Sequence, residues 1–370
     1  MIRNGKMLNK KINYEYFKLA KEVLLLFNSE IIREKKSIKS PKKILVVNTC
    51  IIGEFMVSLP ALNSFIKENN YKIDLMVSPS LKTLAEKIRG VKKVYVAKSV
   101  YSRAIETSKN DLKQTFEKYD LIVIMRLSKE SLNIIKKIKA KEVKTSFIPY
   151  VKYALHLTKN IYINRKKKQW REINFEMLGL KNKDVRFEEI FRFNTKDYKK
   201  VKDLRELKTK EKKVIIHTGS GWSTKLWDNK KWIKFIKMAN SIGNFRFIFI
   251  GGRDEREDFE LIKKSLNFKV YSLIERIDLK DLMILMRMSD FFIGIDSGPR
   301  NMAHLAELRS ISLLGPGPKM YMPTNPKDIV IDKSNCRCTH LFCYKKETCM
   351  NKISVDDVFN AFKKLTTEKR

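Results

Sequence analysis

The chain alternates between short apolar runs of strand length and longer amphipathic runs of helix length, in two separate series. The first series starts near Lys43 and the second near Val214, while residues 181–212 between them are highly charged. Parallel strands need a crossover, usually a helix, to return to the same edge of a sheet. The pattern therefore predicts an α/β protein with two parallel-sheet domains that face each other across a cleft.

The expected elements follow this alternation and divide the chain into five parts. In the first series we expect strands at 44–47, 73–77, 94–96 and 121–125, with helices to about 68, at 81–88 and at 131–139. In the second we expect strands at 214–216, 245–250, 291–295 and 311–314, with helices at 231–241, 257–266, 279–286 and 301–308. The parts are an N-terminal helix in 1–40, domains at 41–185 and 213–350, a linker at 186–212, and a closing helix in 351–370. The closing helix in 351–370 is one that could pack back across the two domains.

The N-terminal segment carries apolar residues at helical spacing over residues 13–35, set among Lys and Glu. Such an amphipathic helix either lies on an anionic membrane surface or packs on the domain that follows it, and the second arrangement is the commoner one. No run of about 18 uncharged apolar residues exists in the sequence, and we expect no transmembrane helix and no export signal. Five cysteines, an odd number, fit a reducing cytoplasm.

The chain is strongly basic, with 78 Lys and Arg against 41 Asp and Glu and a formal net charge of +37. Such an excess favours polyanionic partners: nucleic acid, an anionic membrane face or phosphorylated substrates. The basic residues are scattered along the chain, and no nucleic-acid-binding motif accompanies them. We therefore expect no nucleic-acid partner, although charge alone keeps a nucleic-acid binder as an alternative.

Polar, glycine-containing turns follow three strands of the second series. Asp296, Ser297 and Gly298 follow the strand at 291–295, and Pro299 pre-sets φ for the first turn of a helix. Residues 217–227 and 251–255 follow two other strands. The carboxyl ends of parallel strands share one edge, where helix N-termini and glycine-rich backbone bind phosphates. Each turn alone is a weak signal, and an ordinary βα turn is the alternative for each.

The first series has one comparable turn, in which Gly53 and Glu54 follow the strand at 44–47. A carboxylate just beyond a strand end is able to take a proton from an acceptor hydroxyl. The alternative is an acidic residue that only complements the positive end of a helix dipole.

Residues 43–360 resemble glycosyltransferase family 9, the lipopolysaccharide heptosyltransferases. The matching positions are Gly53, Glu54 and residues 59–62; His217, Thr218, Gly219, Ser220, Lys225, Trp227 and Trp232; Gly251 and Gly252; residues 296–299; and Gly315 with Pro316. The resemblance implies a GT-B architecture of two Rossmann-like domains. It also implies an inverting glycosyltransferase that moves a sugar from a nucleotide-diphosphate donor, ADP-heptose by analogy, to a lipopolysaccharide-core or related glycolipid acceptor.

The resemblance also implies roles for single residues. Thr218, Ser220, Lys225, Ser297 and Gly298 would hold the diphosphate, and Asp296 would bind a sugar or ribose hydroxyl. Asp254 or Glu255 would lie near the nucleoside, and Gly219, Trp227, Gly252 and Asn301 complete the expected donor site. Glu54 would deprotonate the acceptor, and Lys225 would stabilise the leaving group.

Two positions depart from the family pattern. The family usually has Asp where this chain has Glu54, which reaches about one methylene further. The signature His is replaced by Asn301, and His304 lies one helical turn on. These departures leave a second interpretation open, a catalytically inactive family member that binds a nucleotide sugar or glycan.

The remaining expectations concern metals and location. No Asp-x-Asp motif lies in the predicted cleft, so we expect no metal cofactor. The tail carries Cys336, Cys338, Cys343 and Cys349, whose spacing is unusual for a zinc site, and free or packed thiols are the alternative. The basic first domain and the helix at 13–35 favour a phosphorylated lipid-linked acceptor and a peripheral position at the inner face of the cytoplasmic membrane.

Overall fold

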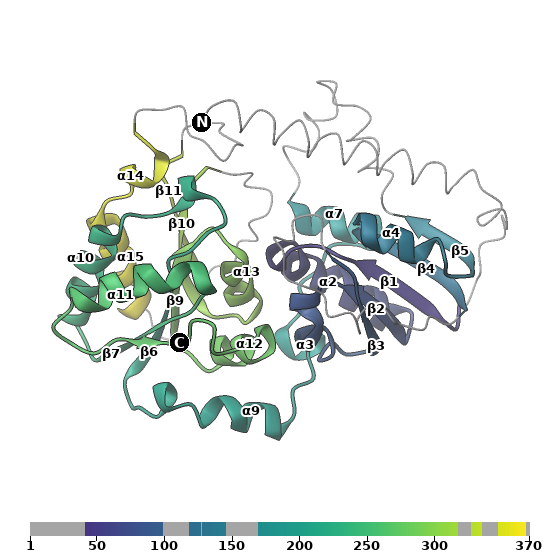
Figure 1. Cartoon of the computed structure of the whole chain (residues 1–370), viewed down its shortest axis with the longest axis horizontal. Helices are drawn as coiled ribbons and strands as arrows, with labels where there is room; N and C mark the ends of the chain where they lie inside the picture. Colours follow the sequence, from purple (N-terminus) through teal and green to yellow (C-terminus); the bar gives the residue numbers. More distant parts are fainter. Residues whose placement is uncertain are drawn as a thin grey trace. The chain divides into compact units, whose positions relative to one another are not determined.

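The computed structural model (Figure 1) describes residues 41–98, 118–126, 128–145, 169–316, 327–334 and 347–367. The chain divides between Arg192 and Phe193 into two compact units. The predicted helix at 13–35 and the cysteines at 336, 338 and 343 lie outside the described residues. In the part of the chain that is described, no helix is both long and apolar enough to cross a bilayer.

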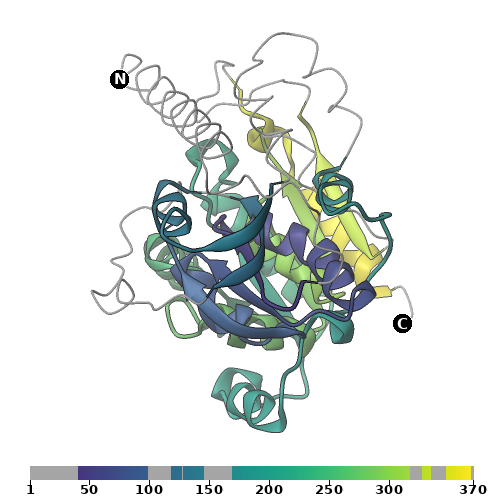
Figure 2. The same ribbon diagram turned by 90° about the vertical axis from the view of Figure 1, so that its right-hand side faces the viewer.

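The first unit is built on a five-stranded sheet in which every neighbouring pair is parallel. Its strands are β1 (Ile44–Asn48), β2 (Ile73–Val77), β3 (Val91–Val96), β4 (Tyr119–Arg126) and β5 (Ala140–Thr145). Its helices are α2 (Ile52–Glu68), α3 (Lys82–Ala85), α4 (Lys129–Ile135), α7 (Trp170–Met177) and α8 (Phe187–Ile190). Figure 2 turns this unit toward the viewer and shows the twist of its purple-to-blue strands.

The second unit has a six-stranded sheet, also parallel throughout. Its strands are β6 (Lys212–His217), β7 (Phe245–Phe249), β8 (Tyr271–Ser272), β9 (Phe291–Ile295), β10 (Arg309–Leu314) and β11 (Asp328–Asp332). Its helices are α9 (Thr195–Lys202), α10 (Asn229–Asn240), α11 (Arg256–Lys264), α12 (Leu279–Arg287), α13 (Gly298–Leu305), α14 (Cys349–Lys352) and α15 (Val355–Thr367). The two parallel-sheet α/β domains expected from the sequence are confirmed.

The strand order places a switch point in each sheet. The first sheet runs β3-β2-β1-β4-β5, and the second runs β8-β7-β6-β9-β10-β11 when read from its β8 edge. Both follow the Rossmann pattern, in which the order reverses beside the first strand. In proteins with this pattern, the loops after the two strands at that point diverge, and ligands commonly bind between them. The relevant pairs are β1 with β4 and β6 with β9.

The charged span 186–212 is folded onto both units. The carbonyl of Glu189 in α8 accepts a hydrogen bond from Asn63 Nδ2 in α2, at 2.7 Å. On the other side, Lys200 of α9 lies 2.5 Å from Asp281 at the start of α12. The division between the units falls between these two attachments. The functional roles assigned to the two domains stay predictions.

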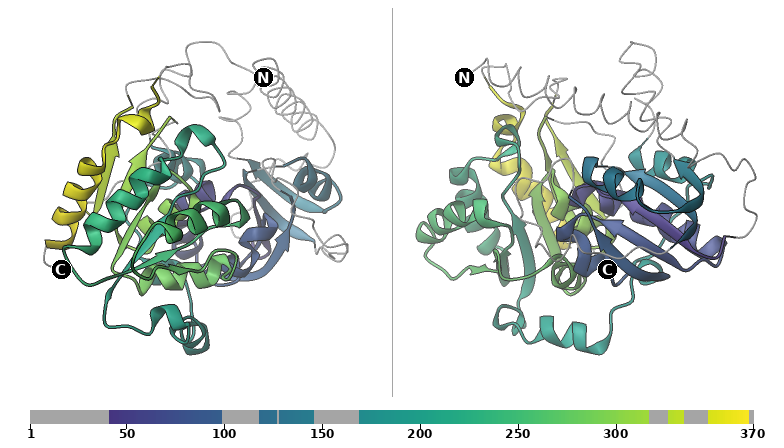
Figure 3. Two further views of the ribbon diagram at one scale, coloured as in Figure 1. Left: turned by 60° about the vertical axis from the view of Figure 1, so that its left-hand side comes forward. Right: turned by 45° about the vertical axis from the view of Figure 1, so that its right-hand side comes forward.

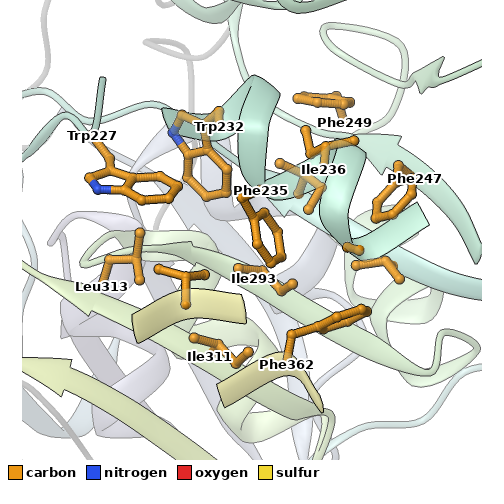
Figure 4. Packing of buried hydrophobic residues seen from close by; sticks show 14 of the residues in the cluster. Trp227, Trp232, Phe235, Ile236, Phe247, Phe249, Ile293, Ile311, Leu313 and Phe362 are labelled. Atoms are coloured by element: carbon orange, nitrogen blue, oxygen red, sulfur yellow. The ribbon is translucent and has the colours of Figure 1, made fainter. Parts of the chain in front are cut away.

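The core of the second unit lies between its sheet and the helices α10 and α15 (Figure 4). Trp232 and Phe235 of α10 and Phe362 of α15 are fully buried there, and the rings of Phe235 and Phe362 meet edge to face. Figure 3 shows α15, in yellow, lying beside α10. A capping box stabilises the N-terminus of α15. The backbone N–H of Ser354 donates to the Asp357 carboxylate at 2.9 Å, and the backbone N–H of Asp357 donates to the Ser354 hydroxyl at 3.0 Å.

We expect Phe362→Ala to lower the free energy of unfolding of the second unit by about 3–5 kcal/mol, because it leaves a cavity among aromatic rings. The matched control is Phe359→Ala on the same helix, where the ring is only partly buried and the loss should be less than half as large. Urea unfolding followed by tryptophan fluorescence measures both, since three of the four tryptophans lie in this unit. Equal losses for the two variants would contradict this account of the core.

Candidate functional site

The switch point of the second sheet brings together two of the three loops singled out in the sequence. The loop after β6 contains a short 3-10 turn that ends at Lys225, and β9 is followed directly by Asp296. Lys225 Nζ lies 2.6 Å from Asp296 Oδ2, and these side chains are only 13% and 19% exposed. Two residues that are 71 positions apart thus form a charge-assisted hydrogen bond at the carboxyl edge of the sheet.

Contacts on other sides fix the position of Lys225. Its ammonium group lies 4.7 Å from the centre of the Trp222 ring, a cation–π contact. Its backbone passes Gly315, where a Cβ atom would come within 3.2 Å of the Lys225 Cα. Ser220 shapes the same loop, because its hydroxyl accepts the backbone N–H of Trp222 at 3.1 Å. Thr218, at the end of β6, is buried.

A buried histidine joins the two strands beneath this ion pair. The Ser297 hydroxyl donates to the Ile295 carbonyl at 3.1 Å and lies 3.1 Å from His217 Nδ1. The contact joins the end of β6 to the turn after β9. Burial lowers the pKa of His217 to about 4, so the imidazole is neutral at pH 7.

Helix α13 points its N-terminus at the same place. It begins at Gly298, three residues earlier than the sequence predicts, because Pro299 fits the first helical turn. The Ser297 side chain does not cap the helix, since its hydroxyl is used by His217 and Ile295. First-turn N–H groups and the helix dipole therefore favour an anion at this end. The helix ends before Glu307, which has a φ of 57°.

Asn301 lies in the first turn of α13 and is buried. Its Oδ1 accepts a hydrogen bond from Arg300 Nη1 at 3.1 Å. Arg300 is fully buried, donates from Nε to Ser312, and lies 3.8 Å from Asp328. Burial lowers the pKa of Arg300, and the carboxylates of Asp328 and Asp296 oppose this shift. His304, one helical turn beyond Asn301, pairs with the same buried carboxylate, because its Nδ1 lies 2.7 Å from Asp328 Oδ2.

The third predicted loop contacts the first one. Glu255 accepts the backbone N–H of Gly252 at 2.7 Å, and its side chain lies against Gly219. A Cβ atom at Gly219 would come within 1.7 Å of Glu255 Oε1, so a larger residue there would displace the Glu255 side chain. Burial raises the pKa of Glu255, whereas the Gly252 N–H opposes that shift. Asp254, the other predicted acid of this loop, is exposed.

Trp227 lies in the core below the loop. Its indole N–H donates to the Ile353 carbonyl at 3.0 Å, and its ring meets Trp232 edge to face. With Thr218 it also borders a cavity of about 290 Å³, whose other lining residues are Leu226, Asp228, Asn229, Asp258 and Asn351. The structure thus gives Trp227 a packing role, and its predicted contact with the donor stays a prediction.

In the first unit, Glu54 lies at the switch point between β1 and β4. It is in the first turn of α2, and its carboxylate is 3.7 Å from Nε of Arg126, the last residue of β4. The guanidinium of Arg126 stacks on Trp170 at 4.2 Å. In the same loop, Cys50 is buried, which raises the pKa of its thiol, and the Glu54 charge adds to that shift.

Sequence reasoning missed three residues that shape these sites: Arg126, Trp222 and Arg300. Arg126 had a signal, because it is a charged residue directly after an apolar strand. Trp222 lies inside the loop that was singled out, and Arg300 lies between two residues that were. Among the residues that the structure describes, no group of three or more His, Cys, Asp or Glu is arranged to hold a metal ion. The side chain of Cys349 is buried at the start of α14.

Comparison with known proteins gives these sites a context. The model of glycosyltransferase family 9 (heptosyltransferase) matches residues 117–353, more than half of the chain. A lipooligosaccharide heptosyltransferase 2 of Campylobacter jejuni is 26% identical over 170 residues, which make up 44% of this chain and 54% of that protein. The chain spans about half the length of the curated relatives it matches.

Solved structures share the fold at low sequence identity. The ADP-heptose LPS heptosyltransferase II of E. coli is 16% identical with a TM-score of 0.65, over 87% of this chain and 98% of that chain. The E. coli heptosyltransferase WaaC, solved with ADP, is 14% identical with a TM-score of 0.62, over 87% of this chain and 99% of that chain. These likenesses confirm the predicted GT-B fold class.

The depressed pKa of His217 predicts a specific loss of stability in acid. The folded state binds this proton only near pH 4, whereas the unfolded chain binds it near pH 6.5, so stability falls as the pH drops through that window. Between pH 7.5 and pH 5 the wild type should lose about 2 kcal/mol more than His217→Gln. Urea unfolding at the two pH values measures the difference. Equal losses in both proteins would refute the assignment of a buried neutral imidazole.

Gly219 offers a test of the contact with Glu255. Gly219→Ala should cost about 1–3 kcal/mol, because the new methyl group overlaps the Glu255 side chain. In a Glu255→Ala background most of that cost should vanish, which a double-mutant cycle in urea unfolding detects. Gly221→Ala is the matched control, since nothing lies within 4 Å of a Cβ there. A cost that persists without Glu255 would show that the backbone, not this contact, demands glycine.

Proposed function

The chain belongs to glycosyltransferase family 9, and on that premise we propose that it transfers a sugar, by family analogy a heptose, from a nucleotide-diphosphate donor to a lipopolysaccharide-core or related glycolipid acceptor. The observation that carries the proposal is the convergence of Lys225, Asp296 and the N-terminus of α13 at the switch point of the second sheet. A cation and helix N–H groups together fit a diphosphate. ADP-heptose is the proposed donor, in keeping with a structural neighbour that was solved with ADP.

The donor diphosphate would bind across the two loops. Backbone and hydroxyl groups of Thr218, Gly219 and Ser220 lie on one side, and Ser297 and Gly298 at the start of α13 lie on the other. Lys225 would supply the positive charge that balances the phosphates. As the bond from the sugar to the diphosphate breaks, negative charge grows on the leaving group, and these preorganised donors would stabilise it.

The polar groups around the diphosphate suit the rest of the donor. Asp296, half of the ion pair with Lys225, would accept hydrogen bonds from sugar or ribose hydroxyls through its carboxylate. Glu255 and Gly252 lie together after β7, at the same edge of the sheet, and would border the nucleoside with Asp254. Asn301 is buried in the first turn of α13, and we propose that it contacts the donor from there.

Glu54 would act as the general base. It would take the proton of an acceptor hydroxyl, whose oxygen then forms a bond to the anomeric carbon while the bond to the diphosphate breaks. Attack from the face opposite the leaving group inverts the configuration at that carbon. The ion pair with Arg126 supports this role over the inactive interpretation, because a nearby cation keeps a carboxylate ionised and ready to accept a proton.

The proposal includes two further expectations. Lys225 and the N-terminus of α13 already offer positive charge to the diphosphate, so we propose that transfer needs no divalent metal ion. The net charge of +37 supports a phosphorylated acceptor, and we propose that the protein works at the inner face of the cytoplasmic membrane. Activity that is unchanged by a chelator, and binding to vesicles that contain anionic lipid, are the corresponding observations.

The central test compares three variants for donor binding and for turnover. Glu54→Gln should bind ADP-heptose within about threefold of wild type by calorimetry, yet lose at least about a hundredfold in turnover with a lipid A–core acceptor. Lys225→Ala should weaken donor binding at least about tenfold, since a charge-assisted contact to phosphate is lost. Lys230→Ala, which removes an exposed charge from the same region, should leave both quantities unchanged.

The outcomes separate the alternatives. Donor binding without turnover in the wild type would favour the inactive, ligand-binding interpretation. Full activity of Glu54→Gln would remove Glu54 from the mechanism. If no nucleotide sugar binds, the assignment of the second unit as a donor domain is wrong.

A further inference from the structure

The switch point of the first sheet contains a charged pair that the sequence did not reveal. Arg126 ends β4 and pairs in register with Asn48 at the end of β1, after a register shift next to Asn48. The backbone N–H of Thr49 donates to the Arg126 carbonyl at 3.2 Å. These contacts hold Arg126 beside the loop that leads into α2, and thus beside Glu54.

Two contacts fix the guanidinium of Arg126 independently of Glu54. Its Nη1 donates to the carbonyl of Met125 at 2.6 Å, and its plane stacks on Trp170, with 4.2 Å between the guanidinium carbon and the ring centre. An Arg side chain otherwise has many rotamers, and each of these contacts removes some of that freedom. The positive charge therefore has a fixed place at this edge of the sheet.

The pair with Glu54 is nearly buried. The two side chains are 8% and 11% exposed, and Nε lies 3.7 Å from Oε2. At that separation, longer than a normal hydrogen bond, the guanidinium acts on the carboxylate mainly through its charge. Low exposure strengthens this effect, because little water screens the two charges.

Cys50 and the N-terminus of α2 also lie beside Glu54. The thiol of Cys50 comes from the loop after β1, and burial raises its pKa, so it stays neutral at pH 7. The N-terminus of α2 adds the partial positive charge of a helix dipole. Arg126 places a full positive charge beside this carboxylate.

We propose that Arg126 is a positioning residue for Glu54, which keeps the carboxylate ionised at acidic pH and limits the directions in which its longer side chain points. The inference rests on the proposed function in taking Glu54 as the base. Trp170 takes part indirectly, because it holds the guanidinium in place. Arg126 itself touches neither donor nor acceptor in this role.

The test measures the ionisation of Glu54 as well as activity. Carbon-13 labelling of glutamate allows the Glu54 carboxyl signal to be assigned by comparison with Glu54→Gln and then titrated in the whole protein. Arg126→Gln should raise the midpoint of that titration by about one pH unit or more. It should also move the acidic limb of the pH profile of kcat/KM upward by the same amount and lower kcat about tenfold to a hundredfold.

Further variants separate charge from orientation. Arg126→Lys keeps the charge but not the planar stacking surface, so the midpoint should stay near the wild-type value while kcat falls. Arg186→Gln, which removes an exposed arginine from the same unit, should change neither quantity. If Arg126→Gln does not fold, Trp170→Leu is the replacement variant. It removes the ring on which the guanidinium stacks but keeps the charge, so kcat should fall while the midpoint of the Glu54 titration stays nearly unchanged.

An unchanged Glu54 midpoint together with an unchanged pH profile in Arg126→Gln would overturn the proposal. So would a kcat that Trp170→Leu leaves intact. Absence of any sugar transfer by the wild type would instead refute the proposed function, and the carboxyl titration would still decide whether Arg126 controls the charge of Glu54.

Discussion

The handedness of the connection between parallel strands is the constraint on which both sites depend. Crossovers between parallel strands are almost always right-handed, so a sheet that grows in both directions from its first strand must reverse its order once. That reversal falls between β1 and β4 in one unit and between β6 and β9 in the other. The loops after these strands part at that point, and Glu54, Lys225 and Asp296 lie on them or in the helical turn that follows.

Each switch point holds paired charges that are largely removed from water. Lys225 with Asp296 and Glu54 with Arg126 have at most about a fifth of their side-chain surface exposed. An unpaired ion in such a place would cost several kcal/mol, so each charge depends on its partner. Because the dipoles and charges are already oriented, they need little reorganisation when a charged ligand arrives.

The sequence predicted the centre of each sheet better than its edges. The spans of β2 and β9 matched those predicted, because central strands are buried on both sides and read as unbroken apolar runs. The strands that escaped prediction, β5, β8 and β11, all lie at or near sheet edges, where partial exposure weakens the pattern. Asp296, Lys225 and Glu54 were singled out because they follow predicted strands or lie in a glycine-rich turn, and their functional roles stay predictions. Arg126 was missed because its meeting with Glu54 depends on strand order and register, which one sequence does not encode locally.

The place of α15 in the core has a consequence for how the protein is made. Phe362 packs in a cluster whose other buried aromatic rings all come from residues 227–291, which are made earlier in synthesis. The first unit has all its strands and helices before Arg192 and is able to fold while translation continues. The aromatic face of the second unit stays uncovered until α15 emerges from the ribosome, an interval on the order of ten seconds at typical rates of synthesis. During that interval the nascent chain is a natural client for chaperones.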